Sequence, residues 1–348
     1  MISDWTLWLE WFIKGLVVTL ALLTGFAYLT WYERRALARI QVRIGPNRAG
    51  PFGLLQPIAD AVKLIFKEEL TPGKADRIVF FWAPIITLVP SIIIAAVIPW
   101  GDKFTAFGRT ITLSVADINV GVLYLMSIAS IAVYGIVLAG WSSNNKYAML
   151  GGLRSSAQMI SYELALGLSL IGPIMLAGSL DLGQIVEGQS RWHGTGWLIL
   201  FAPLSFITYL IAAIAETNRV PFDLPEAETE LVAGFHTEYS AMKFALFFLA
   251  EYINMFTVSM LATTLFLGGW NVPFADVVFG RGTFLFALVS VIGFLLKVIF
   301  FLFLYIWIRG TLPRFRFDQL MSFGWKFLLP LALVSIFVTA TLIFLNVL

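Results

Sequence analysis

The chain has 348 residues, of which 59% are hydrophobic and only 13% are charged, and its formal net charge is +2. Soluble domains carry roughly 25% charged residues, so this composition indicates a polytopic membrane protein. The chain has no cysteine, so it has no ligands for an iron–sulfur cluster. It has only two histidines, which argues against a self-contained haem or zinc site. It also has no glycine-rich phosphate loop, so any redox chemistry must use cofactors held by other chains. We expect no nucleic-acid partner.

Long apolar runs predict an all-α polytopic fold in a single integral membrane domain, residues 1–348. A membrane-spanning helix needs about 20 mostly apolar residues. Eight segments meet this requirement, approximately residues 11–32, 78–99, 118–140, 157–178, 197–216, 240–267, 285–308 and 327–348. Several of them contain proline, which predicts kinks rather than helix ends because neighbouring helices can satisfy the freed carbonyls. These prolines are Pro84, Pro90, Pro173 and Pro203.

The loop after the first span, residues 33–77, contains a segment that predicts a short amphipathic helix with Pro57 in its first turn. At about 12 residues this helix is too short to span a bilayer, and it suits the plane of the lipid headgroups. It could be a surface helix that covers the bundle, or it could frame a side entrance for a lipid-soluble ligand. Its apolar face comprises Ile58, Ala61, Val62, Ile65 and Phe66, and its polar face Asp60, Lys63 and Lys67.

Three ionisable residues lie well inside predicted spans: Glu163, Glu251 and Lys297. Each costs about 3 kcal/mol to insert, so such residues usually pair or line a watery path. One interpretation is a Glu–Lys pair that fixes helix packing. Two acids and one base leave at least one acid without a lysine partner, which favours a proton relay through buried carboxyl groups. Lys297 could pair with Glu163, with Glu251 or with a group on a neighbouring subunit.

The loop after the fifth span, residues 216–239, holds six carboxylates against one cation, Arg219. Pro225 can start a helix there, and favourable interaction with its dipole would explain one or two of the acids. It does not explain all of them, because like charges at such spacing repel. Such a cluster titrates as one coupled set. Its members are Glu216, Asp223, Glu226, Glu228, Glu230 and Glu238, and we interpret the nearby His236 as structural rather than as a ligand.

Lysine and arginine concentrate in the first, third, fifth and seventh loops, which predicts that these loops are cytoplasmic and both termini lie outside. The N-terminal stretch MISDWTLWLEW carries acids where a signal peptide carries basic residues, so we expect it to remain uncleaved. The acidic loop 216–239 then faces the cytoplasm. We expect the protein to be integral to a bacterial inner (plasma) membrane.

Four stretches are long and distinctive enough to be compared with known families. They are Glu33-Arg34-Arg35 followed by RIGPNRAGPFGLLQPIADAVKLIFKE (43–68), GWSSNNKYAMLGGLRSSAQMISYE (140–163), ETNRVPFDLPEAETELVAGFHTEYS (216–240) and Ala250-Glu251-Tyr252. Together they resemble the H-subunit family of respiratory complex I, the proton-translocating NADH:quinone oxidoreductase. The predicted spans between these stretches also fit that family in number and order.

This resemblance implies an eight-span membrane subunit that is not catalytic alone and docks beneath hydrophilic subunits, which carry the flavin and the iron–sulfur clusters. Other implied partners are small membrane subunits, antiporter-like membrane subunits and the lipid bilayer. The substrate would be a ubiquinone- or menaquinone-type quinone, whose tail enters a chamber framed by the first span, the interfacial helix and the sixth span. The resemblance makes four residues candidates for this quinone chamber: Arg34, Arg35, Asp60 and Lys63.

The resemblance also implies that seven acids link the quinone site to proton channels by changing protonation when the quinone is reduced. They are Glu163, Glu216, Asp223, Glu226, Glu228, Glu230 and Glu251. A related membrane-bound hydrogenase or ferredoxin-fed quinone reductase remains an alternative, although the loop motifs favour a quinone-linked enzyme. A stand-alone proton or cation transporter is a second alternative, but transporters usually show internal repeats and none is evident here.

Overall fold

The computed structural model describes residues 4–106, 109–190, 194–223 and 233–345. Over these residues the fold is all-α, as the sequence predicted, apart from one short antiparallel hairpin of β1 (Phe104–Ala106) and β2 (Arg109–Ile111). The long helices are α1 (Asp4–Ile40), α3 (Arg77–Ile94), α4 (Gly121–Ser142), α5 (Lys146–Ala177), α11 (Ala241–Phe266) and α13 (Phe284–Thr311). The shorter ones are α2 (Gln56–Ile65), α6 (Leu182–Gly188), α8 (Leu198–Phe201), α9 (Pro203–Glu216), α12 (Ala275–Phe279), α14 (Phe317–Phe323) and α15 (Leu329–Phe344).

Seven helical stretches within the described residues are long and apolar enough to cross a membrane. The last of them joins α14 and α15 through a π-helical turn, Gly324–Leu328, so it begins ten residues before the predicted span at 327. The fifth predicted span, 197–216, is a broken pair rather than one kinked helix: α8 ends at Phe201 and α9 begins at Pro203. Proline has no N–H to donate, so it is favoured at a helix start. The other three prolines lie inside continuous helices, as predicted.

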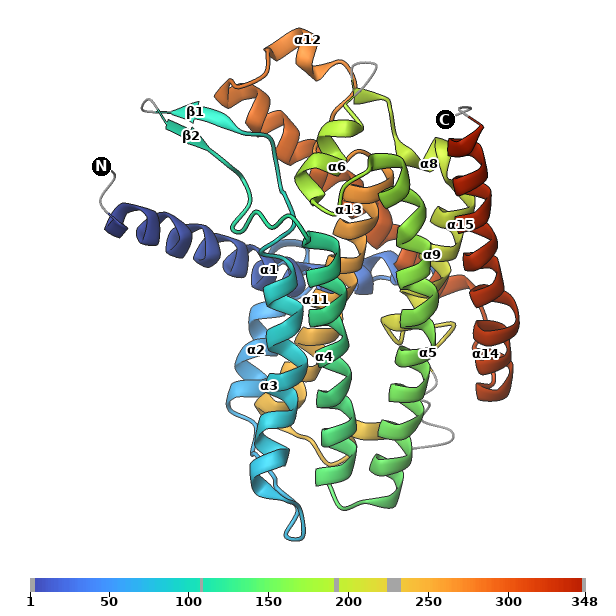
Figure 1. Cartoon of the computed structure of the whole chain (residues 1–348). Helices are drawn as coiled ribbons and strands as arrows, with labels where there is room; N and C mark the ends of the chain where they lie inside the picture. The colour runs from blue at the N-terminus through green and yellow to red at the C-terminus, as the bar shows by residue number, and fades with distance from the viewer. Residues whose placement is uncertain (1–3, 107–108, 191–193, 224–232, 346–348) are drawn as a thin grey trace.

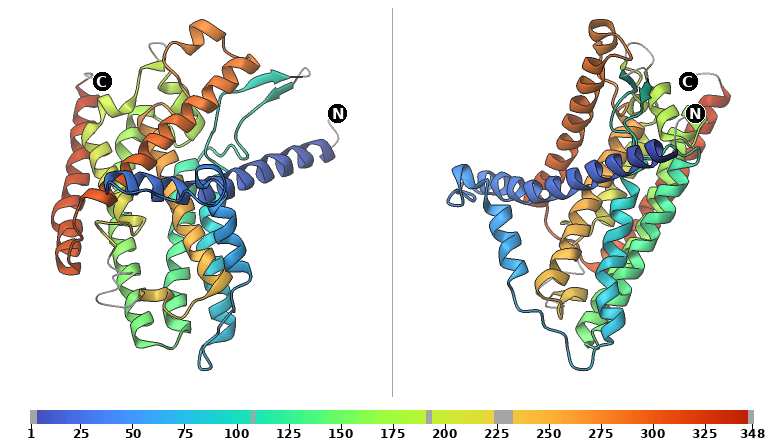
Figure 2. Two further views of the ribbon diagram at one scale, coloured as in Figure 1. Left: turned by 180° about the vertical axis from the view of Figure 1, so that it is seen from behind. Right: turned by 90° about the vertical axis from the view of Figure 1, so that its left-hand side faces the viewer.

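Helices α3, α4, α5 and α11 lie side by side, and α9, α13 and α15 pack against this group (Figure 1). Helix α1 runs past the predicted first span and crosses the other helices at a steep angle (Figure 2). Close approach of α4 to α3 depends on Gly135, where a Cβ atom would collide with the Thr87 hydroxyl oxygen. The centre of the bundle is filled by large buried side chains, among them Tyr162, Tyr209 and Phe266.

Local signals fix several helix ends. Asp76 accepts hydrogen bonds from the backbone N–H groups of Ile78 and Val79 at the start of α3, and Asn145 accepts one from Tyr147 at the start of α5. Such side-chain caps satisfy N–H groups that have no partner inside the helix. Helix α5 ends at Ala177 and is capped by Gly178, whose φ of 68° lies in the left-handed region that favours glycine.

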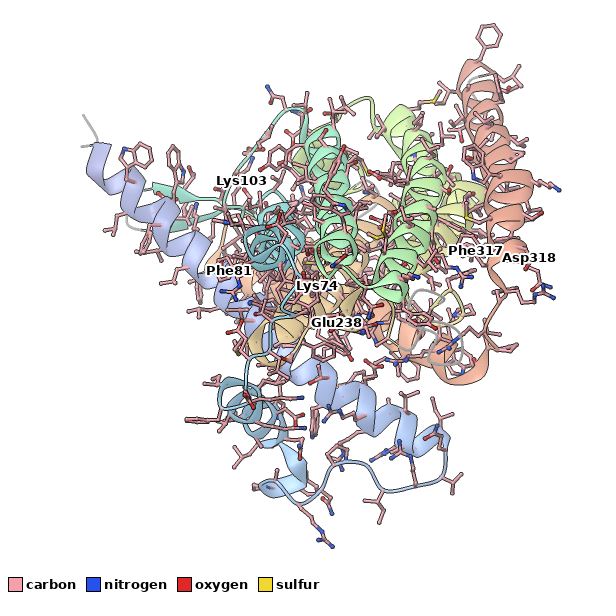
Figure 3. All side chains as sticks on the ribbon, turned by 90° about the horizontal axis from the view of Figure 1, so that it is seen from below. Lys74, Phe81, Lys103, Glu238, Phe317 and Asp318 are labelled. Carbon is pink, nitrogen blue, oxygen red and sulfur yellow. The ribbon has the colours of Figure 1, made fainter. Side chains whose placement is uncertain are left out.

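The two ends of the bundle carry different structures (Figure 1). The hairpin, α6, α12 and the end of α15 lie at the upper pole of that view, whereas residues 66–76 and 143–145 lie at the lower pole. Figure 3 shows the molecule from the lower pole and labels Lys74 and Glu238. Two of the loops predicted to share one side of the membrane, the first and the third, therefore meet at one end of the bundle.

Candidate functional site

A mostly apolar cavity of about 510 Å³ lies between α1, α2 and α11, and we call it the chamber. Ligand pockets for small molecules usually have volumes of about 300–1,000 Å³. Its apolar wall includes Phe26 of α1 and Phe248 of α11, and its charged groups are Arg34, Asp60 and Lys63. Three of the four residues predicted for a quinone chamber thus line one cavity. Helix α2 is a wall of this cavity, which favours the entrance interpretation over a purely covering role.

An ion pair with Arg34 holds helix α2 against α1, and a hydrogen bond within α2 orients the Asp60 carboxylate. The Arg34 Nη1 atom lies 2.7 Å from Asp60 Oδ2, and the Gln56 side-chain amide donates to the other Asp60 oxygen at 3.0 Å. The Arg34 side chain is about half exposed, so the ion pair contributes at most about 1 kcal/mol. Its main effect is to set the position of α2, which has no buried residue of its own.

Arg35, the fourth predicted chamber residue, points away from the chamber. Its guanidinium lies 5.2 Å from the ring centroid of Trp31 and 5.8 Å from that of Phe52, and it donates to the Phe52 carbonyl oxygen at 3.1 Å. It lines a different groove together with Arg39 of α1 and Phe303 of α13. Neighbours in a helix differ by about 100° in direction, and here that rotation turns Arg35 away from the cavity that Arg34 lines.

Arg219 joins three segments that are far apart in the sequence. It is 6% exposed, its Nε atom lies 2.5 Å from a Glu251 oxygen of α11, and its Nη1 atom lies 3.4 Å from a Glu33 oxygen of α1. The guanidinium also lies 4.1 Å from the ring centroid of Tyr252. Arg309 of α13 forms a second ion pair with Glu33. Buried charges need such partners, because an unpaired one loses its hydration without compensation.

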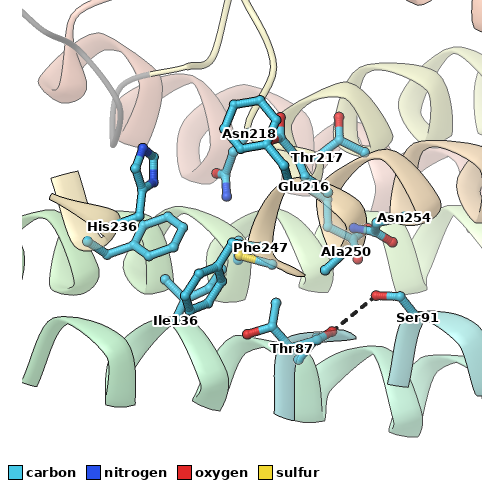
Figure 4. A pocket seen from close by; sticks show the side chains of 15 residues that line it. Thr87, Ser91, Ile136, Glu216, Thr217, Asn218, His236, Phe247, Ala250 and Asn254 are labelled. Atoms are coloured by element: carbon cyan, nitrogen blue, oxygen red, sulfur yellow. Dashed lines mark hydrogen bonds between the residues drawn. The ribbon is translucent and has the colours of Figure 1, made fainter. Parts of the chain in front are cut away.

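Glu216, the last residue of α9, is 7% exposed and lines a polar cavity that also reaches Glu251 (Figure 4). We call it the polar cavity after Glu216, Glu251, Asn218 and Asn254, although apolar side chains such as Phe247 form much of its wall, and its volume is about 50 Å³. A polar space of that size has room for one or a few waters with several hydrogen-bond partners each. Two of the predicted acids therefore border one small polar space inside the bundle.

Two further predicted acids lie beside this pair. Glu163 accepts a hydrogen bond from the Ser130 hydroxyl and is close enough to Glu216 for the two carboxyl groups to interact electrostatically. Asp223 lies 3.2 Å from Arg314 Nη2 and interacts in the same way with Glu251. Nearby carboxyl groups change protonation together. We call Glu163, Glu216, Asp223, Glu251 and Glu33 the carboxylate network. Glu226, Glu228 and Glu230 lie outside the described residues.

Lys297 forms an ion pair with neither of the intramembrane acids. Its Nζ atom donates to the backbone carbonyls of Leu267, Gly269 and Asn271 at 2.7, 3.0 and 2.6 Å. An ammonium group has three N–H donors, and this arrangement uses each of them. The prediction that Lys297 pairs with an intramembrane glutamate is therefore wrong. Its partners are the backbone carbonyls just beyond the end of α11.

His236 also borders the polar cavity, although the sequence suggested only a structural role. Its ring packs edge-on against Phe235 and Phe244, with centroids 4.9 and 5.3 Å apart. Burial lowers the pKa of His236 from 6.5 to about 4, so the imidazole is neutral at pH 7. The sequence did not point to Glu33 as a network residue, because Glu33 follows a predicted span and resembles a solvated loop residue. Its place in the Glu33-Arg34-Arg35 motif was the available signal.

Comparison with known proteins identifies the family. The family model described as NADH dehydrogenase matches residues 13–340. The NADH-quinone oxidoreductase H subunit of Thermomicrobium roseum is 55% identical over 97% of this chain and 96% of its own length. The first of the H subunits of Geobacter metallireducens is 52% identical over 96% of each chain, and subunit 8 of the Thermus thermophilus enzyme is 52% identical over 96% of this chain and 87% of its own. The chain belongs to the H-subunit family of NADH-quinone oxidoreductases.

Proposed function

We propose that this chain forms part of the quinone-binding chamber of an NADH:quinone oxidoreductase and couples quinone reduction to proton translocation. The observation that carries the proposal is that Phe248 of α11 lines both the chamber and the polar cavity. A quinone tail between α1, α2 and α11 would therefore lie one side chain away from the space that Glu216 and Glu251 share. A change of charge in the chamber would therefore occur close to the carboxylate network.

The chain's residues divide the work between binding and proton handling. The apolar wall of the chamber suits an isoprenoid tail, while Arg34, Asp60 and Lys63 offer polar contacts. Reduction of the quinone draws protons or leaves negative charge, and Glu251, which interacts with Asp223, would respond first. Glu216, which borders the same small cavity as Glu251 and interacts with Glu163, would follow. Arg219 holds Glu251 and Glu33 in place during this change.

Electrons must reach the quinone from other chains, since this one has no cysteine for iron–sulfur ligation. We propose that hydrophilic subunits with flavin and iron–sulfur clusters dock at the lower pole, and that antiporter-like and small membrane subunits adjoin the bundle. The chain would lie in a bacterial plasma membrane with both termini outside, as the distribution of basic residues predicts. Mass spectrometry of the gently purified assembly should find these subunits. Purification of the chain alone, with proton or cation transport in liposomes, would support the transporter instead.

Replacement of Glu216 by Gln tests the coupling role. The variant should lose quinone-linked turnover and proton translocation about 100-fold or more, because a positioned proton-transfer group typically contributes about 10² or more. NADH oxidation by an artificial acceptor should stay normal, since that reaction bypasses this chain. Glu187→Gln, the same change at a half-exposed residue of α6, is the matched control and should be silent. Normal pumping in the Glu216 variant would refute the coupling role.

A further inference from the structure

A second groove, of about 570 Å³, lies between α1 and α13 and is separate from the chamber. On α1 it is lined by two columns of residues spaced by four, Trp31, Arg35 and Arg39 beside Tyr32, Ala36 and Ile40. At 3.6 residues per turn these columns lie on the face of α1 opposite the residues that line the chamber. Phe303 provides the facing wall from α13. The two cavities thus flank α1 on opposite sides.

The groove combines apolar walls with two arginines that have no carboxylate partner among the described residues. Arg35 lies between the rings of Trp31 and Phe52, and its one described hydrogen bond goes to the Phe52 carbonyl oxygen, which leaves most of its five N–H donors available. Arg39 is exposed in the last turn of α1. The nearby acids are committed elsewhere: Glu33 pairs with Arg219 and Arg309, and Asp60 pairs with Arg34.

The position of the groove along α1 decides which anion it suits. The predicted apolar span of the first helix ends near residue 32, and both arginines of the groove follow that point, so we infer that the groove lies close to the membrane surface. A pair of arginines at this level matches a phosphate headgroup, and arginine binds phosphate well because it presents several donors in one plane. Tyr32, Ile40 and Phe303 beside them present an apolar surface of the kind that an acyl chain covers.

We propose that this groove binds one anionic phospholipid, with its phosphate held by Arg35 and Arg39 and an acyl chain lying against Phe303. A lipid there would pack the side of α1 that faces away from the chamber. It would thereby keep α1 against α2 and α11 while a quinone tail moves through the chamber. The lipid site does not depend on the proposed function, because its occupancy can be measured without turnover.

Lipid retention by the intact complex tests the site. The complex carrying Arg39→Gln would be compared with wild type and with Arg43→Gln, which removes the same charge from an exposed residue outside the groove. After delipidation and titration with phosphatidylglycerol, native mass spectrometry should show one tight lipid less in Arg39→Gln. Its dissociation constant should rise about tenfold or more, as expected for the loss of one charge-assisted contact. Phosphatidylcholine should bind all three forms equally weakly. Equal retention of phosphatidylglycerol by the two variants would overturn the proposal.

A second measurement locates the lipid, because the chain contains no cysteine and a single one can be introduced. In nanodiscs that contain the whole complex, Phe303→Cys should react with a maleimide several-fold more slowly in phosphatidylglycerol than in phosphatidylcholine. Adding Arg39→Gln should remove this difference, whereas adding Arg43→Gln should not. Crosslinking of Phe303→Cys to a neighbouring protein chain in both lipids would show that protein covers the groove, and it would also overturn the proposal.

Discussion

At the residue scale, the arrangement around Arg219 shows how a single cation organises several acids. The chain carries one cation in the acidic loop, and the structure places it against Glu33 and Glu251 rather than in solvent. Burial of charges from three segments is unfavourable in itself and becomes acceptable because the charges lie within contact of one another. The same contacts fix the approach of the loop to α1 and α11, so Arg219 serves both the fold and the carboxylate network.

Removal of this cation should be severe. Arg219→Gln leaves Glu33 and Glu251 with one partner fewer, and breaking a buried pair costs about 3–5 kcal/mol. We expect a large fall in the amount of assembled protein and in its melting temperature. Adding Glu251→Gln should restore part of the loss, because it removes one of the uncompensated charges. A double variant as unstable as Arg219→Gln would show that the Glu251 contact is not responsible. Arg316→Gln, at an exposed pair with Asp318, is the control and should be nearly neutral.

His236 should make stability depend on pH. Its pKa is about 4 in the folded chain against 6.5 in the unfolded chain, so between pH 6.5 and 4 the unfolded state binds more protons. Stability is therefore lost as pH falls through this window, by up to about 3 kcal/mol. His236→Phe keeps an aromatic ring among Phe235 and Phe244 but cannot bind the proton. Its melting temperature relative to wild type should rise as pH falls from 7 to 4.5. A constant difference would contradict the buried neutral imidazole.

At the element scale, α11 connects the parts of the candidate site. One of its faces lines the chamber through Phe244, Phe248 and Leu249, and Glu251 on the next turn belongs to the carboxylate network. Its far end is held by Lys297 of α13, whose ammonium group binds the carbonyls that follow the helix. A cation at a helix C-terminus also interacts favourably with the helix dipole. Helix α13 thus helps to fix the position of α11 at this end.

Replacement of Lys297 by Met should loosen this attachment. The change leaves three carbonyl groups without their donor, and each buried unsatisfied group costs about 1–3 kcal/mol before relaxation or water entry. We expect a fall of several degrees in the melting temperature of the assembled complex. Lys297→Arg should be intermediate, because a planar guanidinium cannot reproduce three converging bonds from one nitrogen. Lys103→Met, at a surface pair with Glu187, is the control. Equal stability of the Met variant and wild type would refute the attachment.

At the scale of the whole molecule, the two poles of the bundle allow its orientation in the membrane to be tested. Lys74 lies at the lower pole and α12 at the upper pole, so single cysteines at the two sites report opposite sides of the membrane (Figures 1 and 3). A membrane-impermeant maleimide would be added to cells whose cell envelope outside the plasma membrane has been permeabilised. It should label Val278→Cys and leave Lys74→Cys unlabelled. Lysis should expose Lys74→Cys. The reverse pattern would invert the predicted topology, and the absence of native cysteine keeps the background of this chain low.

The all-α membrane class, the approximate position of most long helices and the amphipathic helix beside the first span could all be predicted from the sequence. These properties follow from apolar length and periodicity, which are local and can be read along the chain. The break between α8 and α9 could not be predicted from the sequence, because a proline in a span can either kink a helix or begin a new one. The extension of α1 to Ile40 likewise depends on packing beyond the apolar run.

The pairing of the polar groups, by contrast, follows from the tertiary structure alone. Glu33 and Arg219 are 186 positions apart, and no local pattern predicts that they pair. The partners of Lys297 are backbone carbonyls, which every residue has, so composition could not point to them. Arg34 and Arg35 are neighbours in one motif, yet one faces the chamber and the other the second groove. The physical reason is that burial and pairing depend on how distant segments pack, whereas hydrophobicity acts residue by residue.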